Sequence, residues 1–454
     1  MRIRLSSPIS INELRSLFGY CKEKKDFSIT YVCTDTRELC EGDLFIGVSG
    51  KNFDGALFTD TANDMGAFTL STSESATVKA ATSDDVLSIL IKHFKSKLSH
   101  LIYTVAITGS VGKTTTKELL LSLTGKRFKA HANHKNYNNL LGLFHTVLTA
   151  PEDTELLIAE LGMNAPGEIK AMAKLLTPDI AIITNVGSAH VGMLGSRKEI
   201  ANAKLEICDG LNDSGITVIP YGDQALKTAK NNFTFSADNN SANAFFIPLK
   251  LDSGGTLFDF YSRGKVVCGC RFHIPGEHNF RCLMGAFSAA MLLGIPLREL
   301  SSGLNLLTPD ILRPTILNLG DHTVYNDSYS SSPEALYETM RMLTLYKQPL
   351  SAVIGDMLEL GDKSAYYHRN AGKYAAKFGY RKLYLVGKYA RHIAEGAIAF
   401  GIKKENIHIN SDNDDLAITL DAIDKGYDGE IILVKASHRT GLDRLIKMMM
   451  ERWT

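Results

Sequence analysis

The chain of 454 residues lacks an excess of charge and a long apolar run. Its 50 lysines and arginines nearly balance its 49 aspartates and glutamates, so the formal net charge is +1. A chain without excess charge gives no reason to expect a nucleic-acid partner, whose phosphates would need a basic surface. No stretch reaches about 18 consecutive apolar residues, so we expect no transmembrane helix and no insertion into a membrane.

The chain also lacks paired cysteines. Its seven cysteines are scattered, and although Cys268 and Cys270 are close together, no second pair stands at metal-ligand spacing. We expect all seven to be reduced thiols. The first residues, MRIRLSSPISINELRSLF, have neither the apolar stretch nor the cleavage site of a signal peptide. The expected location is therefore the cytoplasm.

The pattern of apolar residues predicts an α/β protein. With 44% hydrophobic and 22% charged residues, the chain resembles ordinary globular proteins, and its length suggests about three domains. Residues 1–99 read as a small α/β unit. From Leu101, predicted strands alternate with helical patterns, which indicates a parallel sheet with helices on its faces. These strands are predicted at 101–108, 155–160 and 180–184.

Two further stretches complete this interpretation. Residues 216–275 are rich in β signals and turns, so we expect an antiparallel flank there. A third unit starts near Arg313 and reads as a doubly wound sheet. Its strands are predicted at 322–326, 350–354, 382–386 and 430–434.

The sharpest local motif is TGSVGKTT, residues 108–115, which lies between a predicted strand and a predicted helix. Glycines let backbone N–H groups turn toward an anion, and the helix N-terminus adds about half a positive charge. Lys113 can reach the outer phosphates of a nucleotide, and the Thr114 hydroxyl can ligate Mg²⁺. Because Ile107 stands where a standard Walker loop has its first glycine, this is the shorter G-x-x-G-K-T form. A glycine-rich turn without a ligand is the alternative, but it leaves the Lys-Thr-Thr run unexplained.

Glu160 and His190 follow predicted strands of the central sheet. The carboxyl ends of parallel strands form the edge where such sheets bind ligands, so both side chains are candidates for a magnesium site. From position alone, Glu160 is equally well a solvated strand end or a helix cap, and His190 is equally well structural. Lys204 lies on a predicted helix, where a lysine is ordinarily solvated.

Nine elements occur in the order TGSVGKTT, NYNN, ELGMN, TNVGSAH, ANAKLEI, GEHN, LRP, NDSY and GDMLELG. This order resembles the Mur ligases, and among them those that add D-alanyl-D-alanine to UDP-N-acetylmuramoyl-tripeptide. The segment TDTRELCEGDLFIGVSGKNFDGALF is similar to the family's nucleotide-sugar-binding domain. The resemblance implies a cytoplasmic, ATP-dependent ligase that forms a carbon–nitrogen bond through an acyl phosphate. Such an enzyme serves peptidoglycan synthesis and thereby cell-wall biogenesis, cell shape and cell division.

The resemblance also implies three domains and a set of site residues. Residues 1–99 would bind the UDP-sugar substrate, 100–312 would form the ATP-binding phosphate-loop domain, and 313–454 would form a Rossmann-like domain. The catalytic residues would be Lys113, His190, Lys204 and Arg313. The ATP site would comprise Gly109, Ser110, Val111, Gly112, Lys113, Thr114, Thr115, Asn279 at adenine, Arg313 at the phosphates and Asp327 at the ribose. Two Mg²⁺ ions would be held by Thr114, Glu160, His190 and a carbamylated Lys204. The UDP-muramoyl-peptide and the amine would contact Asp35, Thr36, Arg37, Asn136, Asn138, Asn139, Ser188 and Tyr329. We expect a monomer that takes only small-molecule substrates.

The sequence departs from the family pattern at several positions. The usual D-D-S-Y-N-A-N-P stands here as NDSYSSSP, residues 326–333, so both asparagines are replaced by Ser330 and Ser332. Cys282 replaces the second asparagine of H-N-x-x-N, Leu143-Phe144 follow Gly142 where G-x-P is common, and K-G-S-R appears as KASH at 435–438. Two alternatives therefore stay open: a Mur-type ligase with a different amine or carboxylate substrate, and a non-catalytic nucleotide-binding regulator.

Overall fold

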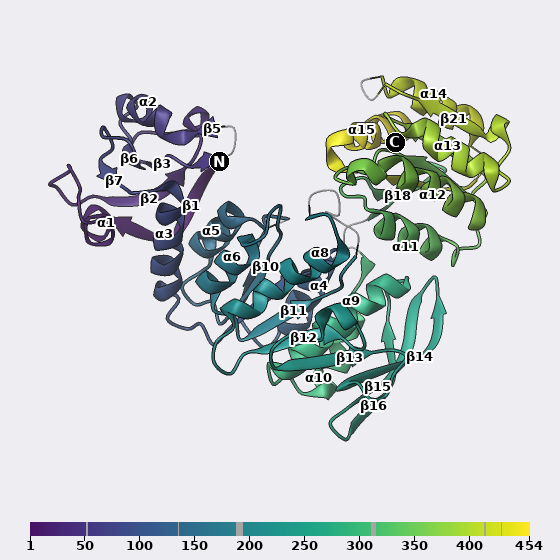
Figure 1. Cartoon of the computed structure of the whole chain (residues 1–454), viewed down its shortest axis with the longest axis horizontal. Helices are drawn as coiled ribbons and strands as arrows, with labels where there is room; N and C mark the ends of the chain where they lie inside the picture. Colours follow the sequence, from purple (N-terminus) through teal and green to yellow (C-terminus); the bar gives the residue numbers. More distant parts are fainter. Residues whose placement is uncertain (51–52, 135, 188–193, 310–314, 413–414, 428) are drawn as a thin grey trace. The chain divides into compact units, whose positions relative to one another are not determined.

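The computed structural model describes residues 1–454 except 51–52, 135, 188–193, 310–314, 413–414 and 428 (Figure 1). The chain folds into two compact units. The first comprises Met1–Ile107, Thr124–Ala181 and Glu206–Gly215, and the second comprises Thr108–Leu123, Ile182–Leu205 and Ile216–Thr454. None of the described helices combines the length and the apolar character needed to cross a membrane. All seven cysteines are free thiols.

The N-terminal part is a five-stranded sheet with helices, as predicted. The order is β1-β2-β3-β6-β7, and only β1 and β2 run antiparallel to one another. Ser10 begins the first helix with a capping box, in which its hydroxyl accepts from the backbone of Glu13 and the Glu13 carboxylate accepts from the backbone of Ser10. The elements are β1 Arg2–Ser10, α1 Ile11–Phe18, β2 Ser28–Cys33, β3 Leu44–Ile46, β4 Ser49–Gly50, β5 Phe53–Asp54, α2 Thr59–Asp64, β6 Phe68–Ser71, β7 Val78–Lys79 and α3 Ser83–Lys97.

A nine-stranded sheet follows, in the order β16-β15-β14-β13-β12-β11-β8-β10-β9. Strand β10 pairs in parallel with both β8 and β9, so the carboxyl ends of these strands lie at one edge. The residues of β8 beyond Tyr103 and all of β10 are buried, which fits the continuous apolar runs that predicted them. The elements of this stretch are β8 Tyr103–Thr108, α4 Lys113–Thr124, β9 Ala130–Ala132, α5 Leu140–Thr149, β10 Leu156–Glu160, α6 Glu168–Leu176, β11 Ile180–Ile183 and α8 Arg197–Leu205.

The antiparallel flank predicted for 216–275 is only half correct. Strands β12, β13 and β14 pair in parallel, and only β14, β15 and β16 are antiparallel. The length of each connection explains the difference, since the two-residue turns at 253–254 and 263–264 reverse the chain whereas the longer connections before β13 and β14 return it to the same end. The elements are β12 Ile216–Pro220, β13 Asn232–Ser236, β14 Ala244–Asp252, β15 Gly255–Ser262, β16 Lys265–Phe272, α9 Glu277–Leu292 and α10 Leu297–Gly303.

The C-terminal sheet is doubly wound, as predicted, with the order β17-β18-β22-β19-β20-β21. Only the edge strand β17 is antiparallel to its neighbour. Val353 of β19 belongs to one apolar cluster, and its neighbours Ala352 and Ile354 belong to another, so both faces of the sheet are covered. The elements are β17 Thr315–Leu319, β18 His322–Asp327, α11 Pro333–Leu343, β19 Leu350–Ile354, α12 Ser364–Lys377, β20 Lys382–Val386, α13 Ala390–Ala399, β21 Ile407–Asn410, α14 Ala417–Gly426, β22 Ile431–Lys435 and α15 Leu442–Trp453.

Candidate active site

The predicted phosphate loop joins the end of β8 to the start of α4. Helix α4 begins at Lys113, so the end of the loop lies at a helix N-terminus, where partial positive charge favours an anion. Two of its positions have room only for glycine. A Cβ at Gly109 would lie 1.9 Å from the Thr184 hydroxyl, and one at Gly112 would lie 2.6 Å from the Cys282 sulfur. The loop therefore owes its close packing to its glycines.

The segment after β11 holds this loop in place. Asn185 accepts from the backbone N–H of Val111 with its side-chain oxygen at 3.1 Å and donates to the Val111 carbonyl at 2.8 Å. The Thr184 hydroxyl donates to the same carbonyl at 2.6 Å, and the Ser110 hydroxyl accepts from the Gly187 N–H at 2.9 Å. These contacts fix the backbone of the loop from one side.

Lys113 folds back over the loop. Its ammonium group donates to the Gly109 carbonyl at 2.9 Å. The half-buried Lys113, Thr114 and Thr115 form the first turn of α4. The lysine charge and the helix N-terminus therefore lie at the same end of α4, as the sequence predicted.

Glu160 ends β10, and its side chain is bound by the NYNN element. The Asn138 amide donates to the Glu160 carboxylate at 2.8 Å, and the Glu160 N–H donates to Asn133 at 2.8 Å. A residue 3% exposed and held in this way is not the solvated strand end that position alone allowed. Asn139 instead caps α5 through the Gly142 N–H at 2.9 Å, and Asn136 is half-buried. The NYNN element thus has one residue on Glu160 and one with a structural role.

Lys204 is the most unusual lysine of the central region. It lies on α8 with only 2% of its surface exposed, although its helical position alone predicted a solvated side chain. No hydrogen-bond or ion-pair partner is present among the described residues. Burial, reinforced by the positive charge of Lys113, holds the pKa of Lys204 well below the usual 10.5. Lys204 is therefore prone to exist as a neutral amine.

Asn279 and its neighbours open helix α9. The Asn279 amide donates to the Pro275 carbonyl at 2.7 Å. Burial lowers the pKa of the adjacent His278 to about 3, with a further contribution from nearby cations, so this imidazole is neutral. Cys282 lies one turn later against Gly112 of the phosphate loop, and burial raises the pKa of its thiol to about 11. The thiol is thus a neutral packing group in the position where an asparagine is usual.

Asp327 ends β18 at the carboxyl edge of the C-terminal sheet. Its Oδ2 atom accepts from the Thr339 hydroxyl at 3.1 Å and from the ammonium group of Lys435. Tyr329, two residues later, is 37% exposed and contacts the ring of His438 edge-on at a centroid distance of 5.1 Å. These predicted site residues lie together within one loop.

Asp35, Thr36 and Arg37 form a cluster of their own in the N-terminal part. Asp35 caps the short 3₁₀ turn Thr36–Glu38 by accepting from the Arg37 backbone at 3.1 Å. The Arg37 guanidinium also donates to the Asp35 carboxylate and holds the pKa of Asp35 well below its usual range. Arg37 remains 86% exposed, so its free edge is available to an anionic ligand.

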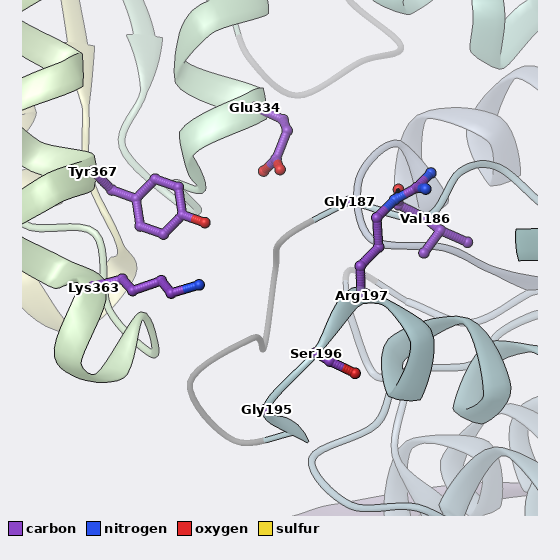
Figure 2. A pocket seen from close by; sticks show the side chains of 8 residues that line it. All are labelled: Val186, Gly187, Gly195, Ser196, Arg197, Glu334, Lys363 and Tyr367. Atoms are coloured by element: carbon purple, nitrogen blue, oxygen red, sulfur yellow. Dashed lines mark hydrogen bonds between the residues drawn. The ribbon is translucent and has the colours of Figure 1, made fainter.

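A cavity of about 480 Å³ lies within the second compact unit (Figure 2). The side chains of Glu334, Lys363 and Tyr367 extend toward its open middle, and Ser196 and Arg197 lie on the opposite wall. Arg197 donates to the Val186 carbonyl at 3.2 Å. The cavity thus carries charges of both signs, which suits a polar ligand. Ser188, His190 and Arg313, which the sequence also predicted, lie outside the described residues.

The comparisons with known proteins decide the family. Residues 107–290 match the Mur ligase middle domain, and residues 313–438 match the Mur ligase glutamate ligase domain. The UDP-N-acetylmuramoyl-tripeptide–D-alanyl-D-alanine ligase of Bacillus subtilis (strain 168) is 32% identical over 433 residues, which cover 92% of this chain and 93% of that protein. The chain belongs to the Mur ligase family.

Solved structures of this family share the fold. The crystal structure of MurF from Acinetobacter baumannii superposes with a TM-score of 0.86 at 24% identity and covers 99% of this chain and all of that one. MurF ligase from Thermotoga maritima, solved in complex with ADP, superposes with a TM-score of 0.75 at 25% identity and covers 93% of this chain and 97% of that one. The three-domain α/β architecture expected from the sequence is therefore that of a MurF-like Mur ligase.

Three residues of this Mur ligase have roles at the site that the sequence did not suggest. Asn185 holds the phosphate loop, Asn133 binds the backbone of Glu160, and Lys435 binds Asp327. Each follows a strand of a parallel sheet or ends one, so the rule that ligand sites lie at carboxyl ends was a usable signal. Many polar residues lie at the carboxyl ends of strands, and the sequence does not show which of them contact one another.

Proposed function

We propose that this chain is an ATP-dependent ligase that joins D-alanyl-D-alanine to UDP-N-acetylmuramoyl-tripeptide in peptidoglycan precursor synthesis. The geometric observation that carries the proposal is the glycine loop that ends in Lys113 at the N-terminus of α4, with the buried Lys204 within electrostatic reach. The identity of the two substrates is inferred from the relatives, because the Bacillus subtilis protein that is 32% identical to this chain is named for that reaction. We further propose that the chain acts as a cytoplasmic monomer, with domain boundaries near residues 99 and 312.

The residues present suit ATP and Mg²⁺. The loop glycines and the helix N-terminus suit phosphate oxygens, and Lys113 adds a mobile cation. The Thr114 hydroxyl and the Glu160 carboxylate are hard oxygen donors of the kind that Mg²⁺ prefers. No group of three or more histidine, cysteine, aspartate or glutamate side chains gathers within the described part of the chain, so the rest of the coordination must come from other groups. We assign that part to the nucleotide phosphates, to His190 and to a modified Lys204.

Lys204 is suited to carbamylation by its burial. Carbon dioxide adds to a neutral amine and not to an ammonium ion, and a lowered pKa increases the fraction of Lys204 that is a neutral amine. The resulting carbamate would be an anion in a place where the free amine has no partner among the described residues. It would therefore supply the oxygen ligands that a second Mg²⁺ needs and would attract the ammonium group of Lys113.

The remaining residues have roles in binding. Asn279 would face adenine, Asp327 the ribose, and Arg313 the phosphates. We propose Asp35, Thr36 and Arg37 at the uridine diphosphate, because Arg37 keeps an exposed edge while Asp35 holds its other side. The substrate carboxylate and amine would contact Asn136, Asn138, Asn139, Ser188 and Tyr329.

The chemistry follows from these charges. A substrate carboxylate attacks the γ-phosphate of ATP and forms an acyl phosphate with release of ADP. The amine then attacks the acyl carbon, and phosphate leaves. A carboxylate and a triphosphate repel one another, so the protein must offset their charge, and Lys113 and Arg313 are the cations for this. Mg²⁺, when bound, would add further positive charge beside the phosphate groups of ATP.

A ligase with a different amine is the second candidate. The motivating observation is the segment Ser330–Ser332, where the family pattern has asparagines and where Ser330 is exposed beside Tyr329. Incubation with UDP-N-acetylmuramoyl-tripeptide, ATP, Mg²⁺ and D-alanyl-D-alanine, followed by mass spectrometry, tests the proposal. The expected product is the sum of both substrates less one water. Absence of this product, with formation of another amide when the amine is changed, would favour the second candidate.

A further inference from the structure

Two neighbouring strands of the C-terminal sheet end in opposite charges. Strand β18 ends at Asp327, β22 ends at Lys435, and the two residues are register partners in a parallel pair. Lys435 is 1% exposed, which is rare for a lysine. We propose that Lys435 is a positioning residue, which orients Asp327 and the following loop for the nucleotide. This inference rests on the proposed function, because it takes Asp327 as the ribose contact.

The contacts of Lys435 leave one carboxylate oxygen of Asp327 available. The ammonium group donates to Asp327 Oδ2, and the Thr339 hydroxyl shares its single proton between the same oxygen at 3.1 Å and the Ala335 carbonyl at 2.9 Å. The other oxygen, Oδ1, has no hydrogen-bond partner among the residues that the structure describes. The carboxylate is therefore held by one oxygen and presents the other, which is the arrangement needed to accept a hydrogen bond from a sugar hydroxyl.

Lys435 also holds the backbone of the serine segment. Its ammonium group donates to the Ser330 carbonyl at 3.0 Å, and the Ser437 hydroxyl is 3.5 Å from the Ser331 carbonyl. At the end of the segment, Ser332 caps α11 by accepting from the Ala335 N–H at 3.3 Å. The loop from Asp327 to α11 is thus tied to the end of β22 through carbonyl groups, which do not depend on the side chains at 330 and 331. This explains how serines can stand there without loss of the loop.

The positive charge of Lys435 matters as much as its hydrogen bonds. Asp327 is only partly exposed, with 15% of its side chain accessible, and an uncompensated carboxylate there would repel a triphosphate. Lys435 cancels that charge from the buried side and leaves the exposed side neutral overall. Removal of the lysine should therefore weaken nucleotide binding more than amine binding.

The test is a double-mutant cycle on the full-length protein, with Mg²⁺-ADP titrated by calorimetry. We expect Lys435→Met to weaken ADP binding by about 10-fold or more, and Asp327→Asn to weaken it by a similar factor. If Lys435 acts through Asp327, the double variant should bind ADP within about threefold of Asp327→Asn alone. The proposal would be overturned if the double variant lost ADP affinity by the product of the two single losses. It would also be overturned if Lys435→Met bound ADP as tightly as the unmodified protein. Because binding of ADP needs no ligation, failure of the proposed amine or tripeptide would not affect this readout.

Controls separate positioning from folding. Lys425→Met on α14, an exposed lysine of the same domain, should leave ADP binding unchanged. Should Lys435→Met not fold, Thr339→Val replaces it, because valine keeps the shape of threonine but donates no hydrogen bond to Asp327. Weaker ADP binding in Thr339→Val, but no further weakening when Asp327→Asn is added, would support the proposal. In Thr339→Val, which leaves the hydrogen bond from Lys435 to the Ser330 carbonyl in place, the KM for ATP should rise while the KM for the amine stays within about twofold, and an equal rise in both would contradict the proposal.

Discussion

Lys113 and Lys204 belong to the same compact unit but differ in their electrostatic environment. Lys113 lies half-buried at the start of α4 and donates to the Gly109 carbonyl, whereas Lys204 is buried on α8 with a lowered pKa. A cation in the first position attracts phosphate. An amine with a lowered pKa in the second is more often neutral and therefore more reactive toward carbon dioxide. The two positions therefore call for different measurements.

Replacement of Lys113 by alanine should stop ligation while the protein remains folded. The change removes a positive charge from the phosphate loop, and loss of one such electrostatic group typically lowers turnover on the order of 10²–10³-fold. Phosphate release measures the activity, and thermal unfolding followed by circular dichroism checks the fold. Lys126→Ala, at an exposed position just beyond the same helix, is the matched control and should keep full activity. Turnover of Lys113→Ala at the unmodified rate would refute the loop assignment.

Replacement of Lys204 by alanine should also abolish activity, but for a reversible reason. Under the proposed carbamylation of Lys204, a small carboxylate that enters the vacated space can replace the carbamate, so acetate or formate should restore part of the turnover. In the unmodified protein, ¹³C-labelled bicarbonate should give a carbamate carbon signal in NMR spectra that Lys204→Ala lacks. A fully active Lys204→Ala protein without any added carboxylate would show that no carbamate is needed.

At the scale of elements, the phosphate loop depends on the segment that follows β11. Asn185→Ala removes two hydrogen bonds to Val111, and each is worth about 1 kcal/mol. We expect the KM for ATP to rise on the order of 10-fold or more, with a smaller change in turnover, because the loop loses its order before the nucleotide binds. Steady-state kinetics with varied ATP provide the measurement, and Asn240→Ala, at an exposed position, provides the control. An unchanged KM in Asn185→Ala would mean that the loop holds its shape without this residue.

The serine segment illustrates a substitution that the fold tolerates. Ser332 is the N-cap of α11, and asparagine is an equally good cap, so Ser332→Asn should leave the free energy of unfolding nearly unchanged. Ser332→Ala should lower it by about 1 kcal/mol. Urea denaturation of the three proteins tests this. Equal stability of the alanine and serine proteins would show that the hydrogen bond at 3.3 Å contributes nothing.

Some strands could be predicted from the sequence because the residues within the strand itself determine them. The strands at 350–354 and 382–386 were predicted with their observed bounds, since buried apolar runs mark them directly. The edge strand β17 and the parallel pairing of β12 and β13 were missed, because strand partners depend on distant segments. The burial of Lys204 was missed for the same reason, as a helix pattern does not say what packs against it.

At the scale of the whole molecule, the family likeness extends over nearly the entire chain, whereas the departures are confined to short segments. The match to the Bacillus subtilis relative covers 92% of the chain, and the departures from the family pattern at the serine segment and at Cys282 change single side chains. The loop at Ser330–Ser332 is held by its carbonyl groups, and Cys282 packs as a neutral thiol. The departures therefore do not bear on whether the fold is that of a Mur ligase.

The most direct test is phosphate release from ATP in the presence of Mg²⁺, UDP-N-acetylmuramoyl-tripeptide and a panel of amines. We expect release only when both the tripeptide and D-alanyl-D-alanine are present. Release with a different amine would retain the ligase chemistry but contradict the proposed substrate. Release without any acceptor, or none with any amine, would contradict the assignment as a ligase.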